Sequence, residues 1–431
     1  MPSYDRTIKY LFSLESLGFR PGLKRIRALL RELGDPHLSY RTVHVAGTNG
    51  KGSTSAMIEA VLTEAGYRTG LYTSPHLERF NERIRISRKL ITDTEVVEVA
   101  DAVRRASGKV KKSAGAPTFF EFTTAMALLY FKVKGVQIAV IETGMGGRLD
   151  ATNVIRPLLS VITNIGLDHS EHLGDTLVEV AGEKAGIIKR ATPVVTGEEG
   201  SGPLEVIKKA SGRMGAGLYI LGHDFSFRAG RGGISAPFDY QGVNSSIKGL
   251  RLNLPGAHQM KNAALALTAA YLLRDNGFFI PDGAVRAGLK KVLWPGRLEI
   301  VMKRPLVILD GAHNPDGAAA LKEALRRLRF RRLILVLGIM ADKDIGGILR
   351  ELSPLASLII LTRARTKRAA GTRLLKEKSP ACGARRISAR TVPGALRAAL
   401  GEAGPGDCVT VTGSLYVVGE ARRHIFRNRP S

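Results

Sequence analysis

A glycine-rich turn carries the residues whose types and spacing are best suited to chemistry. Its sequence is His44-Val45-Ala46-Gly47-Thr48-Asn49-Gly50-Lys51-Gly52-Ser53-Thr54. A β-prone run precedes the turn and helical spacing follows it, so backbone N–H groups, a helix N-terminus and one lysine are expected to meet there. This combination predicts phosphate binding. The usual P-loop has Ser or Thr directly after the lysine, whereas Gly52 intervenes here, so an ordinary glycine-rich turn stays open as the alternative.

Three polar residues stand at or just after the ends of further β-prone runs. They are Ser74, Glu142 and His169. An acid at the end of a buried strand, downstream of a phosphate loop, is typical of a Mg²⁺ ligand. Because the carboxyl ends of parallel strands meet at one edge of a sheet, we expect the three side chains on that edge. An exposed turn serine and a structural histidine are the alternatives for Ser74 and His169.

Two other features are ambiguous from local sequence. Lys184 lies in a predicted helix, where its spacing alone indicates an ordinary surface lysine. Phe119, Phe120 and Phe122 begin another helix, and clustered phenylalanines more often belong to a core than to a ligand site.

The elements that must position these residues alternate between strand and helix. Helices are predicted at two places within 4–33, then at 53–65, 93–106, from 118 onward, and at 175–189, 257–273 and 282–292. Strands are predicted at 42–46, 68–73, 136–141, 158–163 and 193–196. Between about 200 and 255, short alternating runs separated by glycines indicate a small antiparallel β section.

A Pro/Gly hinge at Trp294-Pro295-Gly296-Arg297 marks the predicted domain boundary, which divides the chain into 1–296 and 297–431. Alternation then restarts, with strands expected at 306–309, 333–337, 357–361 and 408–411 and helices at 316–328, 345–352 and 393–402. This half is Rossmann-like but lacks the Gly-x-Gly-x-x-Gly fingerprint, so dinucleotide binding is not supported.

Composition excludes several classes. The 431 residues are 44% hydrophobic, and no apolar run approaches the roughly 18 residues of a spanning helix, so a membrane role is not expected. The first residues lack a signal-peptide pattern and there are only two cysteines, which favours the cytoplasm. The formal charge is +27, and residues 298–431 hold 25 basic against 11 acidic residues. Nucleic-acid binding is nevertheless not favoured, because aromatics are 6% and no nucleic-acid motif accompanies the charge.

Taken in order, the motifs resemble those of the folylpolyglutamate synthase/dihydrofolate synthase family, a branch of the Mur ligase superfamily. The resemblance covers about residues 4–420, and Gly52 is the normal form in that family. The motifs that carry it are His44–Ser53, Thr73–Leu77, Glu142–Asn153, Asp168-His169, Glu183–Ile187, His258–Asn262, Gly296-Arg297 and Asp310–Pro315.

The resemblance implies an α/β protein. Its N-terminal domain would be a P-loop-type parallel-sheet ATPase domain with a small antiparallel β section, and its C-terminal domain a Rossmann-like glutamate-ligase domain. The implied activity is ATP-dependent amide ligation through an acyl phosphate, in which L-glutamate is added to dihydropteroate, a reduced folate or both. The implied cofactors are ATP and Mg²⁺ at two sites, and a monomer is expected.

The resemblance also implies roles for individual residues. Catalytic roles fall on Lys51, Glu142, His169 and Lys184, the last as a carbamate. One Mg²⁺ would use Ser74 and Glu142, and a second Glu142 and His169, with carbamylated Lys184 as a further ligand. ATP contacts fall on Gly47, Thr48, Asn49, Gly50, Lys51, Gly52, Ser53, Asn262, Arg297, Asp310 and His313. Pterin or folate contacts fall on Thr118, Phe120, Asp150 and Ala151.

Three alternatives stay open. Within the family, the chain could be a folylpolyglutamate synthase alone. Outside it, a Mur-type cell-wall ligase acting on a UDP-sugar peptide is disfavoured by the 74–77 and 310–315 motifs, and a basic nucleic-acid-binding protein is the remotest possibility. Polyglutamate length and linkage, and the preferred folate form, do not follow from the sequence.

Overall fold

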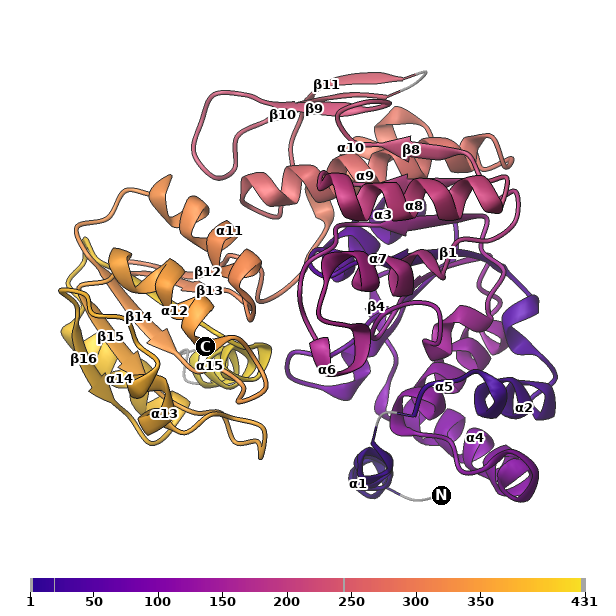
Figure 1. The fold of residues 1–431 in the computed structure, drawn as a ribbon, viewed down its shortest axis with the longest axis horizontal. Coiled ribbons are helices and arrows are strands. Elements are labelled where there is room, and N and C mark those ends of the chain that lie inside the picture. Colours follow the sequence, from indigo (N-terminus) through magenta and orange to yellow (C-terminus); the bar gives the residue numbers. More distant parts are fainter. Residues whose placement is uncertain (1–2, 19, 243–244, 428–431) are drawn as a thin grey trace. The chain divides into compact units, whose positions relative to one another are not determined.

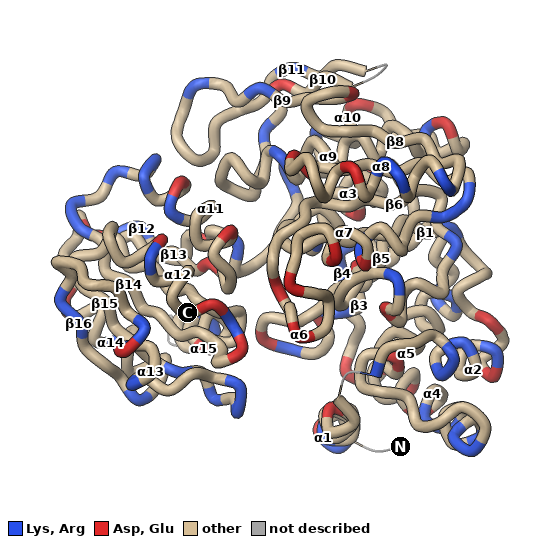
Figure 2. The backbone as a smooth tube through the Cα atoms, in the orientation of Figure 1, with Lys and Arg blue, Asp and Glu red and all other residues tan. Residues whose placement is uncertain are grey.

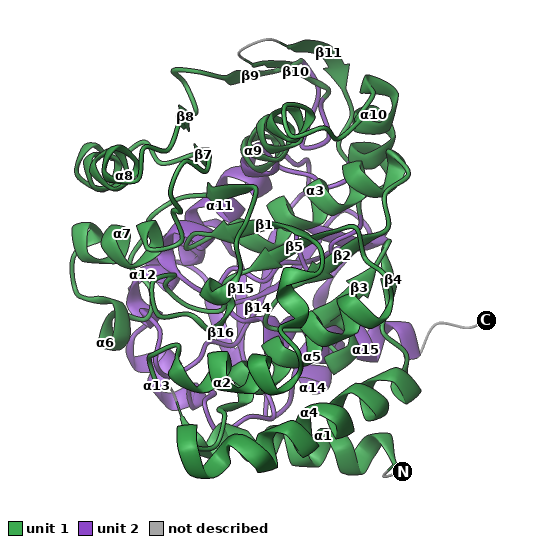
Figure 3. Ribbon diagram, turned by 90° about the vertical axis from the view of Figure 1, so that its right-hand side faces the viewer, with its two compact units in different colours: residues 1–230, 237–252, 260–292 green, residues 231–236, 253–259, 293–431 purple. Residues whose placement is uncertain are grey.

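The computed structural model describes residues 3–18, 20–242 and 245–427. The chain divides into two compact units (Figure 3). Unit 1 comprises 1–230, 237–252 and 260–292, and unit 2 comprises 231–236, 253–259 and 293–431. Three short segments that the predicted boundary assigns to the first domain, 231–236, 253–259 and 293–296, therefore cluster with unit 2.

Unit 1 is built on an eight-stranded sheet in the order β4-β3-β2-β5-β1-β6-β7-β8. The strands β2, β5, β1, β6, β7 and β8 run parallel, and β3 and β4 add an antiparallel edge. The bounds are β1 Arg41–Ala46, β2 Thr69–Tyr72, β3 Ile84–Ile86, β4 Lys89–Leu90, β5 Ile138–Glu142, β6 Leu159–Ile162, β7 Val194–Thr196 and β8 Leu218–Ile220. Apolar, β-branched runs such as Ile138-Ala139-Val140-Ile141 form these strands because both faces of the sheet are covered.

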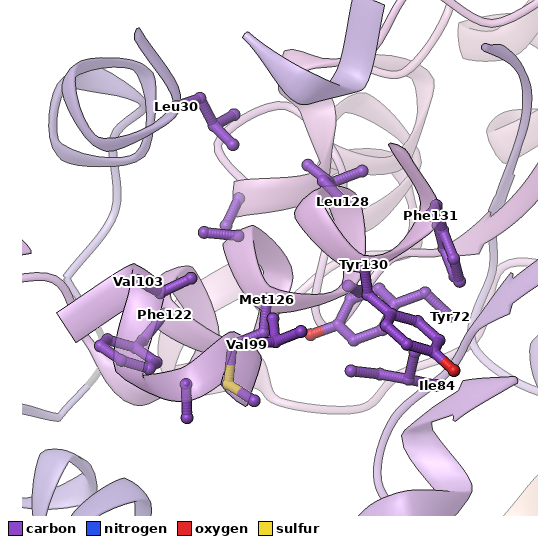
Figure 4. Packing of buried hydrophobic residues seen from close by; sticks show 14 of the residues in the cluster. Leu30, Tyr72, Ile84, Val99, Val103, Phe122, Met126, Leu128, Tyr130 and Phe131 are labelled. Carbon is purple, nitrogen blue, oxygen red and sulfur yellow. The ribbon is translucent and has the colours of Figure 1, made fainter. Parts of the chain in front are cut away.

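Helices pack on this sheet, and a hydrophobic core lies among those near the N-terminus (Figures 1 and 4). Phe122, Met126 and Phe131 of α5 are fully buried there with Tyr72 and Leu30. The helices of unit 1 are α1 Tyr4–Ser13, α2 Lys24–Glu32, α3 Lys51–Glu64, α4 Asp93–Ala114, α5 Phe119–Val133, α6 Ser170–Leu173, α7 Leu177–Ala185, α8 Ser201–Arg213, α9 Ala257–Arg274 and α10 Asp282–Lys291, of which α9 begins in the 253–259 segment of unit 2. Short 3₁₀ turns lie at Leu14–Leu17, Pro36–Leu38, Phe80–Arg83 and Ala151–Val154.

The structure corrects the prediction for residues 200–255 in part. Residues 201–213 form helix α8, and β8 pairs with β7 in the parallel sheet. The antiparallel section is real but smaller: β9 Ser226–Ala229, β10 Phe238–Gln241 and β11 Ser246–Leu250 form a separate sheet. The helix was missed because glycines and lysines dilute its apolar face, which buries little more than Pro203, Ile207 and Ser211.

Unit 2 carries a six-stranded sheet in the order β12-β13-β17-β14-β15-β16, with β12 antiparallel and the rest parallel. Its strands are β12 Glu299–Lys303, β13 Leu306–Leu309, β14 Leu333–Leu337, β15 Leu358–Leu361, β16 Arg385–Ser388 and β17 Cys408–Thr412. Its helices are α11 Pro315–Arg326, α12 Ile345–Leu352, α13 Thr372–Glu377, α14 Val392–Glu402 and α15 Leu415–Arg427, with a 3₁₀ turn at Ser353–Leu355. The predicted Rossmann-like alternation is confirmed, while the edge strands β12 and β16 and the helices α13 and α15 were missed.

Lysines and arginines are spread over both units, and unit 2 has many of them in its loops (Figure 2). None of the helices in the described part of the chain is both long enough and apolar enough to cross a membrane.

Candidate active site

The glycine turn joins β1 to α3, and α3 begins at Lys51 itself, two residues earlier than predicted. Gly50 precedes it in the left-handed region, with φ of 81°. A side chain at Gly47 (φ 149°) would place its Cβ 1.8 Å from Thr163 Oγ1. Glycine is therefore required at both positions, and the first-turn N–H groups of α3, which have no acceptor within the helix, point into the turn.

The turn is fastened to the segment that follows β6. Thr163 Oγ1 donates to the carbonyl oxygen of Asn49 (2.6 Å), and Asn49 N donates to Asn164 Oδ1 (2.9 Å). Thr48 Oγ1 donates to the Gly166 carbonyl at 2.9 Å. Thr163 and Asn164 were not predicted as site residues, although their position directly after a buried strand could have indicated them.

Two lysines converge on one carbonyl oxygen of the turn. Lys51 Nζ donates to the Gly47 carbonyl at 3.0 Å and to the Thr48 carbonyl at 3.2 Å. Lys184 Nζ, from α7, donates to the same Gly47 oxygen at 2.9 Å. Lys184 is only 3% exposed, so the prediction of a surface lysine from its helical spacing was wrong.

Burial changes the chemistry of Lys184. Desolvation, reinforced by the charge of Lys51, lowers the pKa of the Lys184 amine to about 7, against the opposing fields of Asp168 and Asp150. A substantial fraction of this amine is therefore uncharged near neutral pH. An uncharged amine is a nucleophile, whereas an ammonium group is not.

Glu142 and Ser74 meet at adjacent strand ends. Glu142 is the last residue of β5, and β5 pairs with β2, which Ser74 follows. The backbone N–H of Ser74 donates to Glu142 Oε2 at 3.0 Å, and Glu142 is 4% exposed. In strand order, Ser74, Glu142, the glycine turn and Thr163 thus occupy one edge of the sheet, as the sequence predicted for the first three.

His169 stands at the N-terminus of the short helix α6, with φ of 56°. Its backbone N–H donates to Asp168 Oδ1 at 3.0 Å, and its side chain is partly exposed. Within the described ranges, no three His, Cys, Asp or Glu side chains gather closely enough to hold a metal ion.

The donor types on this edge nonetheless fit a hard cation. Ser74 and Glu142 supply hydroxyl and carboxylate oxygens, which Mg²⁺ prefers. Beside Glu142, the buried hydroxyl of Thr143 has no hydrogen-bond partner among the residues that the structure describes. A magnesium ion held by Ser74 and Glu142 is therefore compatible with the residues present.

The four predicted pterin residues lie near the glycine-rich loop 144–150. A Cβ on Gly144 would lie 2.5 Å from Phe120 Cζ, so the Phe120 ring covers this loop. Thr118 caps α5 through reciprocal hydrogen bonds with Glu121. The hydroxyl and capping groups of Thr118 are thus engaged within the fold, whereas Phe120 is only partly buried.

Asp150 is also engaged in the fold. It is 5% exposed, accepts from Met145 N (2.9 Å) and Thr152 Oγ1 (2.5 Å), and Ala151 follows it into a 3₁₀ turn. Thr152 Oγ1 in turn lies 2.9 Å from Nε2 of the fully buried His44. Because the Thr152 hydrogen goes to Asp150, His44 must donate from Nε2. A buried hydrogen-bond chain thus joins β1, next to the glycine turn, to loop 144–150.

Asn262 and three residues of unit 2 complete the predicted ATP set. In unit 1, Asn262 lies against the glycine turn, since a Cβ on Gly50 would approach its Oδ1 to 2.4 Å. In unit 2, a Cβ on Gly311 would lie 2.8 Å from Arg297 Nη1, and His313 Nδ1 lies 2.9 Å from the Gly311 carbonyl. Asp310 accepts from Leu298 N and Ala312 N, at 2.9 and 3.0 Å. Arg297, Asp310 and His313 are therefore brought together around Gly311.

The chain matches the Mur ligase middle domain over residues 45–270 and the glutamate ligase domain of Mur ligases over 296–415. A Mycobacterium tuberculosis folylpolyglutamate synthase complexed with ADP superposes with a TM-score of 0.91 at 34% identity, covering 99% of this chain and 100% of that one. Escherichia coli FolC in complex with DHPP and ADP superposes with a TM-score of 0.90 at 30% identity, with full coverage of both chains. The fold is that of a Mur ligase, an ATP-dependent ligase class.

Curated relatives narrow the class further. A Bacillus subtilis protein named dihydrofolate synthase/folylpolyglutamate synthase is 37% identical over 429 residues, covering 98% of this chain and 99% of its own length. A Haloferax volcanii relative, named probable bifunctional folylpolyglutamate synthase/dihydropteroate synthase, is 39% identical, but this chain spans only 50% of it. The chain belongs to the dihydrofolate synthase/folylpolyglutamate synthase family.

Proposed function

We propose that this protein adds L-glutamate to dihydropteroate, and also to reduced folates, by ATP-dependent ligation. The observation that carries the proposal is the carboxyl edge of the sheet of unit 1. There Lys51 and Lys184 donate to the same carbonyl oxygen of the glycine turn, and Glu142 ends the strand that pairs with β1. An acyl phosphate forms between two anions, so catalysis requires positive charge and aligned N–H groups where negative charge collects.

ATP would lie with its phosphates on residues 47–53, where Lys51 and the first-turn N–H groups of α3 stabilise the β- and γ-phosphates. Asn262 would contact the base, and Arg297, Asp310 and His313 would contribute contacts from unit 2. Mg²⁺ bound by Ser74 and Glu142, and at a second site by Glu142 and His169, would offset the phosphate charge when present. In the ligation step the acceptor carboxylate attacks the γ-phosphorus and ADP leaves. The glutamate amine then displaces inorganic phosphate and loses a proton.

Lys184 would act as a carbamate. The ammonium group first loses a proton. The uncharged amine then attacks CO₂, a C–N bond forms, one C–O π bond becomes a lone pair on oxygen and a second proton leaves the nitrogen, so the cation becomes an oxygen-donor anion. The low pKa of the Lys184 amine and its burial support this conversion. The product would be a further Mg²⁺ ligand beside Glu142.

Phe120 and loop 144–150, with Thr118, Asp150 and Ala151 behind them, would form one wall of the pterin site. This arrangement supports dihydrofolate synthase activity together with folylpolyglutamate synthase activity. In this proposal residues 1–296 bind ATP, residues 297–431 form the glutamate-ligase domain, and the enzyme works as a cytoplasmic monomer.

Phosphate release tests the function directly. The full chain is supplied with ATP, Mg²⁺ and L-glutamate, and dihydropteroate, tetrahydrofolate and a UDP-muramyl peptide are compared as acceptors. We expect glutamate-dependent turnover with dihydropteroate and with tetrahydrofolate. Turnover with tetrahydrofolate alone would reduce the activity to folylpolyglutamate synthase, and turnover only with the UDP-muramyl peptide would contradict the folate proposal.

A further inference from the structure

The loop that follows β15 in unit 2 is built to expose positive charge. Its sequence over 363–370 is Arg-Ala-Arg-Thr-Lys-Arg-Ala-Ala. Ala364, Ala369 and Ala370 are buried, whereas Arg363, Arg365 and Lys367 are exposed. The small residues thus anchor the loop while the cations alternate with them on the outside.

Backbone hydrogen bonds hold this loop to the segment that follows β14. Ala341 N donates to the Arg368 carbonyl at 2.8 Å, and Ala370 N donates to the Ile339 carbonyl at 2.9 Å. Met340 and Ala369 form an antiparallel bridge between the same two segments. The backbone N–H of Arg365 donates to Glu420 Oε1 at 2.6 Å. The loop is therefore fixed at the carboxyl edge of the sheet of unit 2.

The cations of the loop differ in their pairing. Arg368 forms an ion pair with Asp342 at 2.8 Å. Within residues 3–18, 20–242 and 245–427, no ion pair is formed by the side chains of Arg363, Arg365 or Lys367. Other arginines of unit 2 are compensated, such as Arg331 and Arg332, which share Asp407. Three uncompensated cations on one anchored loop form a surface suited to an anion with several charges.

The position of the loop suggests which anion this is. It lies on the same edge of the parallel sheet as the Asp310–His313 segment after β13 and the segment after β17. This inference rests on the proposed function, in which each turnover adds a net one carboxylate to the acceptor. An acceptor that is extended repeatedly therefore becomes a polyanion. We infer that Arg363, Arg365 and Lys367 bind the carboxylates of an oligoglutamate tail on the acceptor.

Variants of equal charge test this inference. The triple variant Arg363→Gln/Arg365→Gln/Lys367→Gln is compared with the control Lys303→Gln/Arg327→Gln/Arg329→Gln, which removes one lysine and two exposed arginines near the amino-terminal edge of the same sheet. KM is measured for folate acceptors with one, three and five glutamates. A fluorescent pentaglutamate peptide, α- or γ-linked, is titrated in parallel, so that binding is measured without turnover.

We expect the loop variant to raise KM for the five-glutamate acceptor about tenfold, which is the binding energy that three exposed charge contacts would supply. KM for the one-glutamate acceptor should be unchanged. The effect should shrink at high salt, because exposed charges are screened. The inference is overturned if the control variant has the same effect, or if wild type and loop variant bind pentaglutamate equally. It is also overturned if the loop variant loses binding of a short RNA but keeps that of pentaglutamate. Absence of turnover with every acceptor would contradict the proposed function instead, because the peptide titration would still report on the loop.

Discussion

The two parallel sheets present charge at their carboxyl edges in opposite ways. In unit 1 the ionisable groups Glu142 and Lys184 are buried, and main-chain N–H and carbonyl groups hold them. In unit 2 the edge carries an anchored loop whose cations Arg363, Arg365 and Lys367 are exposed to water. Both edges suit anions, but Glu142 and Lys184 are removed from solvent, whereas the three cations of the loop are not.

This difference in solvent exposure determines how each edge can act on an anion. Charges in a buried, preorganised site interact strongly and need no reorganisation when charge develops, so they suit a reacting centre. Exposed charges are screened and contribute little each, so they suit a surface that gathers a flexible polyanion. Loss of one group should therefore matter far more at the edge of unit 1.

The largest expected effect is at Lys51. Lys51→Met should lower ATP turnover by at least about a hundredfold, the usual cost of about 3 kcal/mol for a lost preorganised charge contact. Phosphate release and urea unfolding of the same samples measure activity and stability. Lys132→Met is the control, since Lys132 Nζ also donates to a carbonyl, that of Gly34, away from the site. Comparable losses of turnover in Lys51→Met and Lys132→Met would contradict a specific role of Lys51 in phosphate binding.

Burial in unit 1 should also give its stability a pH dependence. Desolvation lowers the pKa of His44 to about 3, so the unfolded state binds the extra proton and stability is lost as pH falls below about 6.5. At pH 5 this loss is about 2 kcal/mol. Desolvation raises the pKa of Glu59 to about 7, so its contribution is present below about pH 4.5 and is lost as pH rises towards 7.

Removing either group should therefore tilt the stability curve in opposite directions. The free energy of unfolding is measured in urea between pH 5 and 7. Relative to the wild type, the slope of stability against pH should be more negative in His44→Gln, which loses the term that rises with pH. It should be more positive in Glu59→Gln, which loses the term that falls with pH. The glutamine at position 44 can still donate to Thr152, which isolates the titration from the hydrogen bond. Parallel curves for all three proteins would contradict the burial of these charges.

Close packing under the pterin wall gives a smaller effect. Gly144→Ala should lower the free energy of unfolding by about 1–3 kcal/mol, because its Cβ would collide with the Phe120 ring. Phe120→Leu in the same chain should restore part of that loss. Gly108→Ala in α4 is the matched control, since a Cβ there meets nothing within 4 Å and should be neutral or stabilising. Equal destabilisation by both alanines would show that loop 144–150 tolerates the collision.

The smallest expected effect is at the edge of unit 2. His313→Ala should lower kcat/KM for ATP by about tenfold, the scale of one partly exposed polar contact. His313→Asn, which can keep a donor near the Gly311 carbonyl, should recover part of the loss. A loss as large as that of Lys51→Met would mean that the two edges contribute equally to turnover.

Much of this protein was set by its sequence alone. Strands such as Leu333–Leu337 and helices such as Ile345–Leu352 occur where their periodicity predicted them, because burial imposes that periodicity. The glycine turn was recognisable for a similar reason, since left-handed and close-approach positions such as Gly50 and Gly47 admit no other residue without strain. Strand order was not readable, but the common edge of parallel strands already put Ser74 and Glu142 together.

What each side chain faces depends on contacts between elements that lie far apart in the chain. Lys184 is buried against Gly47 because α7 packs its last turn on the glycine-rich loop, where Gly147 lies against the carbonyls of Glu183 and Lys184. That contact spans 137 residues of chain, so no local pattern encodes it. Thr163 and Asn164 became part of the glycine turn for the same reason. Periodicity records whether a residue is buried, whereas long-range packing determines which group it meets. For Lys184, that packing buries the amine and lowers its pKa.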